Sequence, residues 1–147
     1  MENFDAVDIL IVEDNPNDAE LMTRALKKQK LANNLYVVED GAEALDFIFC
    51  RGKYEKRHLA QPPKVIFLDL KLPKVSGLEV LKELKGNAST RKLPVVVVSS
   101  SKEDPDIKAA YELGTNSYVV KPVDFDDFVG AMSQLGLYWL VVNEQPK

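Results

Sequence analysis

The chain has 147 residues, a net charge of −4, 46% hydrophobic and 29% charged residues, which is typical of one globular domain over residues 1–147. No apolar run reaches the roughly 20 residues of a membrane span, the first residues lack the basic start of a secretory signal, and the acidic balance argues against nucleic acid as a partner. The single cysteine, Cys50, excludes an internal disulfide and fits a cytoplasmic location.

Five short runs of β-branched and aliphatic residues predict strands at 7–12, 35–38, 65–68, 95–98 and 118–120. The first, third and fourth runs lack polar–apolar alternation, as expected for strands buried on both faces. Longer segments with helical spacing lie between the runs. Their apolar positions are Ala19, Met22, Ala25 and Leu26; Ala44, Leu45, Ile48 and Phe49; Leu78, Leu81 and Leu84; and Ile107, Ala110, Tyr111 and Gly114. A last helix is expected from about 124 to about 142.

Strands that alternate with helices imply right-handed crossovers and a parallel sheet covered on both sides. The fold class is therefore α/β. The leading architecture is a flavodoxin-like, doubly wound sheet of five strands in the order 2-1-3-4-5 with five helices. In such sheets ligands bind outside the carboxyl ends of the strands, near the switch between strands 1 and 3.

Side chains able to carry chemistry follow four of the five predicted strands: Glu13, Asp14, Asp69, Ser99, Ser100 and Lys121. If the fold is right, they converge in one cleft. Three close carboxylates repel one another unless a proton or a cation relieves them, and Mg²⁺ suits carboxylate oxygens. An aspartate is a known acceptor in covalent phosphoryl chemistry, and a lysine supplies a point charge for a phosphoryl oxygen.

Each element has a plainer interpretation when it is taken alone. Glu13 and Asp14 precede Asn15 and Pro16, which form a common helix start. Asp69 alone fits a strand-end turn, and a lysine before a proline is an ordinary loop signal. The joint placement at four strand ends of one sheet favours a phosphorylation site over these separate explanations.

These residues give the chain a resemblance to the response-regulator receiver family (the CheY-like superfamily), from about residue 8 to about residue 134. The matching stretches are 9–15 (Ile-Leu-Ile-Val-Glu-Asp-Asn), 65–73 (Val-Ile-Phe-Leu-Asp-Leu-Lys-Leu-Pro), Gly77, 94–99 (Pro-Val-Val-Val-Val-Ser), Gly114 and 118–122 (Tyr-Val-Val-Lys-Pro). Together they are highly specific, although each alone would be weak.

The resemblance implies a two-component switch that takes a phosphoryl group from the phosphohistidine of a sensor histidine kinase, and not a turnover enzyme. Asp69 matches the phosphoacceptor. Asp14 matches the carboxylate that binds Mg²⁺ directly, Glu13 its neighbour that acts through water, and the backbone carbonyl of Lys71 a further metal ligand. Glu13 stands where the family more often has aspartate, which keeps the charge.

Further positions match the family's phosphate-binding and switch residues. Ser99 matches the hydroxyl residue that turns toward the phosphoryl group, and Lys121 the lysine that pairs with it. Ser100 matches the small residue whose backbone N–H reaches the phosphate. Tyr118 matches the aromatic switch, which moves inward when the hydroxyl residue is recruited. Lys71 and Ser101 occupy positions that tune autodephosphorylation, so the lifetime of the phosphoryl group is left unpredicted.

The C-terminal part of the chain is unusually apolar. We expect a receiver core over about 7–134 and an apolar helical extension over about 135–147, with no fused output domain. Phe125, Phe128, Val129 and Met132 are expected to face the sheet. Because the extension is apolar on nearly all sides, we expect a homodimer contact through it; a tail folded back on its own domain is the alternative. This layout resembles the regulators paired with phytochrome-type histidine kinases.

Three other functions remain open. The first is an unphosphorylated docking module, against which the complete set of site residues argues. A phosphatase with Asp69 as nucleophile would want a second aspartate at position 71, where Lys71 stands, and a flavodoxin-like flavin protein would not place acidic residues after strand 1. The basic stretch 51–64 is either a docking loop or a solvated loop. His58, the only histidine, lies in this stretch and is not expected to be a phosphodonor.

Overall fold

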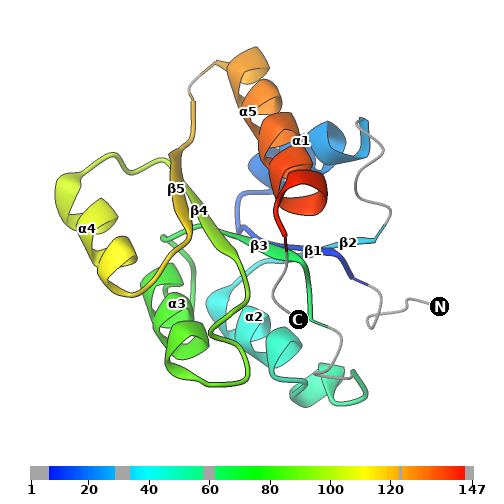
Figure 1. Cartoon of the computed structure of the whole chain (residues 1–147), viewed down its shortest axis with the longest axis vertical. Coiled ribbons are helices and arrows are strands. Elements are labelled where there is room, and N and C mark those ends of the chain that lie inside the picture. Colours follow the sequence, from blue (N-terminus) through cyan, green and yellow to red (C-terminus); the bar gives the residue numbers. More distant parts are fainter. Residues whose placement is uncertain (1–6, 29–33, 58–61, 123, 145–147) are drawn as a thin grey trace.

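The computed structural model describes residues 7–28, 34–57, 62–122 and 124–144. Its centre is a five-stranded parallel sheet with the order β2-β1-β3-β4-β5 (Figure 1). The strands are β1 (Ile9–Val12), β2 (Leu35–Val38), β3 (Val65–Leu68), β4 (Val95–Ser99) and β5 (Ser117–Val120). The predicted strand order is confirmed, although β1 begins two residues later than its apolar run.

Helices cover both faces of the sheet (Figure 1). On one face α1 (Pro16–Lys28) lies beside α5 (Phe125–Leu137), which continues into the wider helical turn η3 (Tyr138–Val142). On the other face lie α2 (Gly41–Ile48), α3 (Gly77–Gly86) and α4 (Asp104–Glu112), and the short 3₁₀ turn η2 (Gly52–Tyr54) follows α2. The last helix therefore spans the expected length, with a change of helical pitch after Leu137.

The strands divide the core into two apolar layers, because successive side chains of a strand point to opposite faces. On β1, Ile9 and Ile11 pack in the layer beneath α1 and α5, whereas Leu10 and Val12 pack in the layer beneath α2, α3 and α4. All four are fully buried or nearly so. This two-sided burial explains why the run lacks polar alternation.

Two side chains that were expected in the core are exposed. Tyr111 is 52% exposed, because α4 buries a single residue, Ala110. Phe125 is 56% exposed, because it is the first residue of α5 and precedes the turn that reaches the core through Phe128. The other predicted apolar positions of α5, Val129 and Met132, pack in the core layer.

The start of α1 orients the loop that follows β1. The side-chain Oδ1 of Asn15 accepts the backbone N–H groups of Asn17 and Asp18 at 2.9 and 3.1 Å, and Pro16 is the first helical residue. This is a helix cap of the expected type. The helix start and the acidic pair before it are thus separate features of one segment.

Gly77 lets α3 begin against the loop that follows β3. A Cβ atom at this position would lie 2.1 Å from the carbonyl oxygen of Asp69, and the Gly77 N–H donates to the carbonyl of Leu70 at 2.8 Å. A side chain would push the two backbones apart. Glycine at this position therefore helps to hold Asp69 at the strand end.

Candidate functional site

Strand register brings the predicted site residues to one edge of the sheet. Val12 of β1 pairs with Leu68 of β3, so the next residues, Glu13 and Asp69, leave the sheet side by side. The Asp69 N–H also donates to the carbonyl of Val12 at 3.1 Å, and the Lys121 N–H donates to the carbonyl of Ser99 at 2.8 Å. Residues from four strand ends therefore meet in one place, as the sequence predicted.

Lys121 lies at the centre of this group, which we call the strand-end cluster (Glu13, Asp14, Asp18, Asp69 and Lys121). Its ammonium nitrogen Nζ lies 2.5 Å from Glu13 Oε1, 3.0 Å from Asp18 Oδ2 and 3.1 Å from Asp69 Oδ2. The Lys121 side chain is 9% exposed and that of Glu13 is 1% exposed. Three carboxylates thus share one cation in a largely buried position.

Three of the carboxylates could hold a metal ion. One oxygen each from Glu13, Asp14 and Asp69 lies within 4.8 Å of the others. Glu13 Oε2 is buried without a hydrogen-bond partner, the one such side-chain atom in the part of the chain that the structure describes. An orphaned carboxylate oxygen beside two further carboxylates fits a hard divalent cation, which prefers oxygen ligands.

Burial and crowding disfavour negative charge at this site. Burial raises the pKa of Glu13 to about 9; Asp69 adds to that rise, and Lys121 opposes it. Burial alone would lower the pKa of Lys121, but Glu13, Asp69 and Asp18 together raise it well above its ordinary value. The Lys121 ammonium therefore stays protonated. One ammonium does not balance the carboxylates around it, so the cluster as a whole has too little positive charge.

The loop after β4 joins the two predicted switch residues. Ser99 is fully buried, and its hydroxyl oxygen accepts the N–H of Ser101 at 3.2 Å. The Tyr118 hydroxyl donates to the carbonyl of Ser101 at 2.7 Å. Ser101 thus links the switch pair, and its own hydroxyl donates to Asp106 at the start of α4.

The remaining predicted residues border the cluster. The Lys71 N–H donates to Asp69 Oδ1 at 3.3 Å, and Lys71 is exposed. Ser100, directly after β4, is exposed. Asp18 is the cluster member that the sequence prediction missed. The Asn15 cap places Asp18 near the same strand end, but its contact with Lys121 depends on how α1 leaves the sheet.

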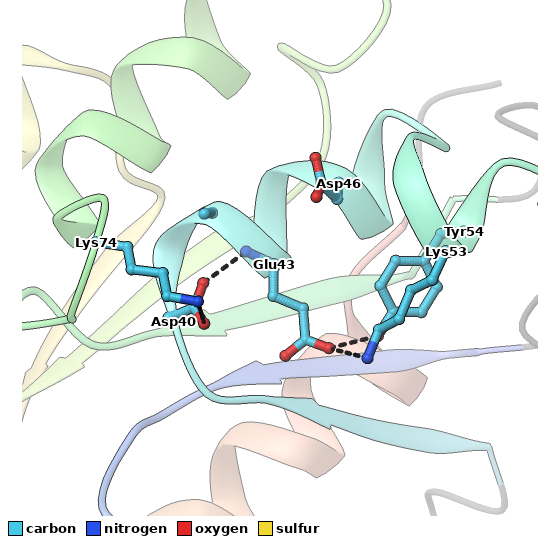
Figure 2. A pocket seen from close by; sticks show the side chains of 7 residues that line it. Asp40, Glu43, Asp46, Lys53, Tyr54 and Lys74 are labelled. Atoms are coloured by element: carbon cyan, nitrogen blue, oxygen red, sulfur yellow. Dashed lines mark hydrogen bonds and ion pairs between the residues drawn. The ribbon is translucent and has the colours of Figure 1, made fainter.

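A second polar group lies along α2 and η2 (Figure 2). We call Asp40, Glu43, Asp46, Lys53, Tyr54 and Lys74 the α2–η2 cluster; with Ala42 these residues line a hollow of about 310 Å³. Glu43 Oε2 accepts the Tyr54 hydroxyl at 2.7 Å and pairs with Lys53 at 2.8 Å, and Lys74 lies 3.6 Å from Asp40. Each of these carboxylates has a neighbouring cation, as in a structural network. His58 lies outside the described residues.

Comparisons with known proteins agree with this geometry. The family model described as "Response regulator receiver domain" matches residues 9–133. Response regulator Rcp1 of Synechocystis sp. is 36% identical over 132 residues, covering 90% of this chain and 88% of Rcp1. A crystal structure of Mn²⁺-bound Rcp1 aligns with a TM-score of 0.88 at 35% identity, covering 95% of this chain and 98% of that one.

Two further solved structures extend the comparison. The phosphorylated cyanobacterial phytochrome response regulator RcpA aligns with a TM-score of 0.88 at 34% identity, covering 95% of this chain and 97% of that one. The bacteriophytochrome response regulator AtBRR is 51% identical, with a TM-score of 0.72 and coverage of 92% and 96%. The matched residues span both the sheet and its strand-end cluster, and the chain accordingly belongs to the response regulator receiver domain family of two-component signalling proteins.

Proposed function

We propose that Asp69 accepts a phosphoryl group from the phosphohistidine of a sensor histidine kinase, in the presence of Mg²⁺. The observation that carries this proposal is the meeting of Asp69 with one buried ammonium and two further carboxylates at the carboxyl edge of the sheet. Relatives support it, because RcpA is described as phosphorylated and Rcp1 as Mn²⁺-bound.

The transfer moves one phosphoryl group between two side chains. A carboxylate oxygen of Asp69 attacks phosphorus, the P–N bond to the kinase histidine breaks, and an acyl phosphate forms on Asp69. Lys121 holds one phosphoryl oxygen by charge, while the Ser99 hydroxyl and the Ser100 N–H donate to the others. Bound Mg²⁺ supplies neutralising charge for the phosphoryl oxygens. Its proposed ligands are Glu13 through water, Asp14, Asp69 and the Lys71 carbonyl.

Recruitment of Ser99 would then reach Tyr118 through the loop that both residues contact. The Ser101 N–H now donates to the Ser99 hydroxyl oxygen, so a move of Ser99 toward phosphate breaks that bond and shifts the carbonyl that holds Tyr118. Phosphorylation biases two conformations by its different interaction with each. Water later hydrolyses the acyl phosphate, so the protein acts as a switch and not as a turnover enzyme.

A phytochrome-type histidine kinase is the proposed partner, in the cytoplasm. The support is the 50% and 51% identity to two bacteriophytochrome response regulators, RtBRR and AtBRR. Competition between phytochrome-type and other histidine kinases for phosphotransfer to this protein tests the pairing. Faster transfer from a kinase without a phytochrome sensor would contradict it.

We further propose that the chain is one receiver domain, over about 7–134, whose C-terminal extension from about 135 forms a homodimer contact. The extension is partly folded back, since Trp139 is 7% exposed within the α1–α5 layer. Its other side is apolar and open, with Tyr138, Val141 and Val142 between 48% and 62% exposed.

No helix in the described segments is long and apolar enough to cross a membrane. Light scattering on wild type and Val141→Lys tests the contact; a monomer in both would contradict it.

The deciding experiment weighs the intact protein after incubation with Mg²⁺ and acetyl phosphate. We expect a gain of about 80 Da in wild type, none in Asp69→Asn, and none without the metal. Asp46→Asn is the matched control, because it removes a carboxylate from the α2–η2 cluster and should leave the gain unchanged. No adduct on wild type within seconds, with donor and metal in excess, would point to an unphosphorylated docking module instead.

A further inference from the structure

We propose that Asp18 is a positioning residue, which holds the Lys121 ammonium in place for phosphoryl transfer to Asp69. This role rests on the function proposed above and adds a residue to it. Asp18 is the third residue of α1, and it reaches Lys121 across more than one hundred residues of sequence.

The Lys121 ammonium has three N–H groups, and each has one acceptor in the structure. The acceptors are Glu13 Oε1 at 2.5 Å, Asp18 Oδ2 at 3.0 Å and Asp69 Oδ2 at 3.1 Å. An ammonium donates three hydrogen bonds and accepts none. The three carboxylates therefore determine where the end of this long, flexible side chain lies.

Two of these three acceptors have a second task. Glu13 and Asp69 both belong to the group of oxygens that could hold a metal ion, whereas Asp18 does not. Asp69 also loses its carboxylate charge when it becomes an acyl phosphate. Among the three acceptors, Asp18 alone keeps its full charge for Lys121 throughout the transfer. A lysine that must meet a phosphoryl oxygen gains from a fixed partner on its opposite side, because positioning lowers the entropic cost of reaction.

Asp18 is itself well placed to act as this fixed partner. Its backbone N–H donates to Asn15 Oδ1 at 3.1 Å, so the cap of α1 fixes its backbone at the strand end. Its side chain is 28% exposed, between the buried Lys121 and solvent.

The plainer alternative is that Asp18 only stabilises the helix start, where the dipole favours an acidic residue. Glu20 gives the matched control. It is exposed on the same helix and pairs with Arg24 at 2.9 Å, four residues further on. Glu20→Gln removes a carboxylate from the same helix, and this carboxylate pairs with Arg24 and not with Lys121.

The test is a double-mutant cycle on the full chain, with acetyl phosphate as donor and intact mass as readout. Rates of phosphoryl gain are compared for wild type, Asp18→Asn, Glu20→Gln, Lys121→Met and the Asp18→Asn/Lys121→Met double variant. We expect Asp18→Asn to lower the rate about tenfold, Glu20→Gln to leave it unchanged, and Asp18→Asn to change it less than about twofold once Lys121 is methionine. The Mg²⁺ concentration for half-maximal rate should be the same in wild type and Asp18→Asn.

Three results would overturn the proposal. An unchanged or faster rate in Asp18→Asn would show that the carboxylate does not position Lys121. If Asp18→Asn lowers the rate equally with Lys121 and with methionine at position 121, the effect is a structural one on α1. In that case the Tm of Asp18→Asn should also lie below that of Glu20→Gln. If wild type itself gains no phosphoryl group, the proposed function fails and this role fails with it; if wild type reacts normally, only the role of Asp18 is in question.

Discussion

The strand-end cluster and the α2–η2 cluster use the same residue types in opposite ways. In the first, Glu13, Asp18 and Asp69 share the ammonium of Lys121, and Asp14 lies beside them. In the second, the carboxylates have separate cations: Glu43 pairs with Lys53, Asp40 with Lys74, and Asp46 with Arg51. One cluster carries an excess of negative charge, and the other is balanced once the neighbouring Arg51 is counted.

Two glutamates show what this difference means. Burial and the neighbouring Asp69 raise the pKa of Glu13 to about 9. For Glu43, burial also favours a higher pKa, but hydrogen bonds from Lys53 and Tyr54 outweigh it and lower the pKa. A balanced cluster stabilises the fold, whereas unbalanced buried charge costs stability and is expected where a ligand relieves it. The pKa values of the two glutamates thus shift in opposite directions, because hydrogen bonds outweigh burial at Glu43 and do not at Glu13.

The largest contrast is expected when each lysine is removed. Lys121→Met leaves buried carboxylates without their cation and should lower the free energy of unfolding by about 3 kcal/mol. Lys53→Met removes a side chain that is 66% exposed and should cost about 0.5 kcal/mol or less. Urea unfolding without metal measures both. Saturating Mg²⁺ should restore most of the loss in Lys121→Met only; equal losses in the two variants would break the comparison.

Glu13→Gln should change metal binding and stability in opposite directions. The variant loses a proposed ligand, so Mg²⁺ affinity should fall about tenfold or more. It also removes an acid that must take up a proton on folding at neutral pH, because its folded pKa is raised to about 9, so the metal-free protein should gain about 1 kcal/mol. Titration calorimetry and thermal unfolding are the measurements, with Glu43→Gln as the control that keeps the metal affinity. A metal-free Glu13→Gln protein that is less stable than wild type would contradict this explanation of the site.

Tyr54→Phe should weaken the α2–η2 cluster and leave the signalling site intact. The Tyr54 hydroxyl donates to Glu43 and lies 2.9 Å from the Tyr36 hydroxyl. Tyr54 as a whole is 1% exposed. Its removal should cost about 1 kcal/mol of unfolding free energy. The rate of phosphoryl gain at Asp69 should not change. A slower rate would show that the two clusters are coupled.

The smallest effect expected is a pH dependence from Glu43. Its folded pKa lies below the unfolded value of 4.5, so its ionised form stabilises the fold above about pH 4.5, and this contribution is lost as pH falls through the lower folded pKa. Unfolding of wild type and Glu43→Gln at about pH 7 and about pH 3 should show a gap of less than about 1 kcal/mol that closes in acid. A constant gap at both pH values would exclude this linkage.

Much of the site follows from local sequence because the strands are simple. Four of the five apolar runs are followed directly by one of Glu13, Asp69, Ser99 and Lys121, and a parallel sheet places all carboxyl ends at one edge. The positions of these four residues could therefore be predicted from the sequence. Asp18 was not, because its position depends on how α1 leaves the sheet.

Burial on helices was harder to predict from periodicity. The apolar face of α1 was right at all four positions, since α1 packs against both the sheet and α5. The predicted burial of Tyr111 and Phe125 was wrong, because the area that a helix buries depends on where it lies relative to the sheet edge. Helical spacing indicates which side chains share a face, but not whether that face meets the core.

The sequence by itself determined the strand order, the chemical types at each strand end and the family. These depend on two-sided burial and on the direction of parallel strands, which short runs of residues record. Only the tertiary structure decided which carboxylates share Lys121, which oxygen of Glu13 has no partner, and which side of the C-terminal extension is covered. Those facts depend on distances between atoms far apart in the chain, and a difference of a few ångströms between two packed elements leaves no local pattern in the sequence.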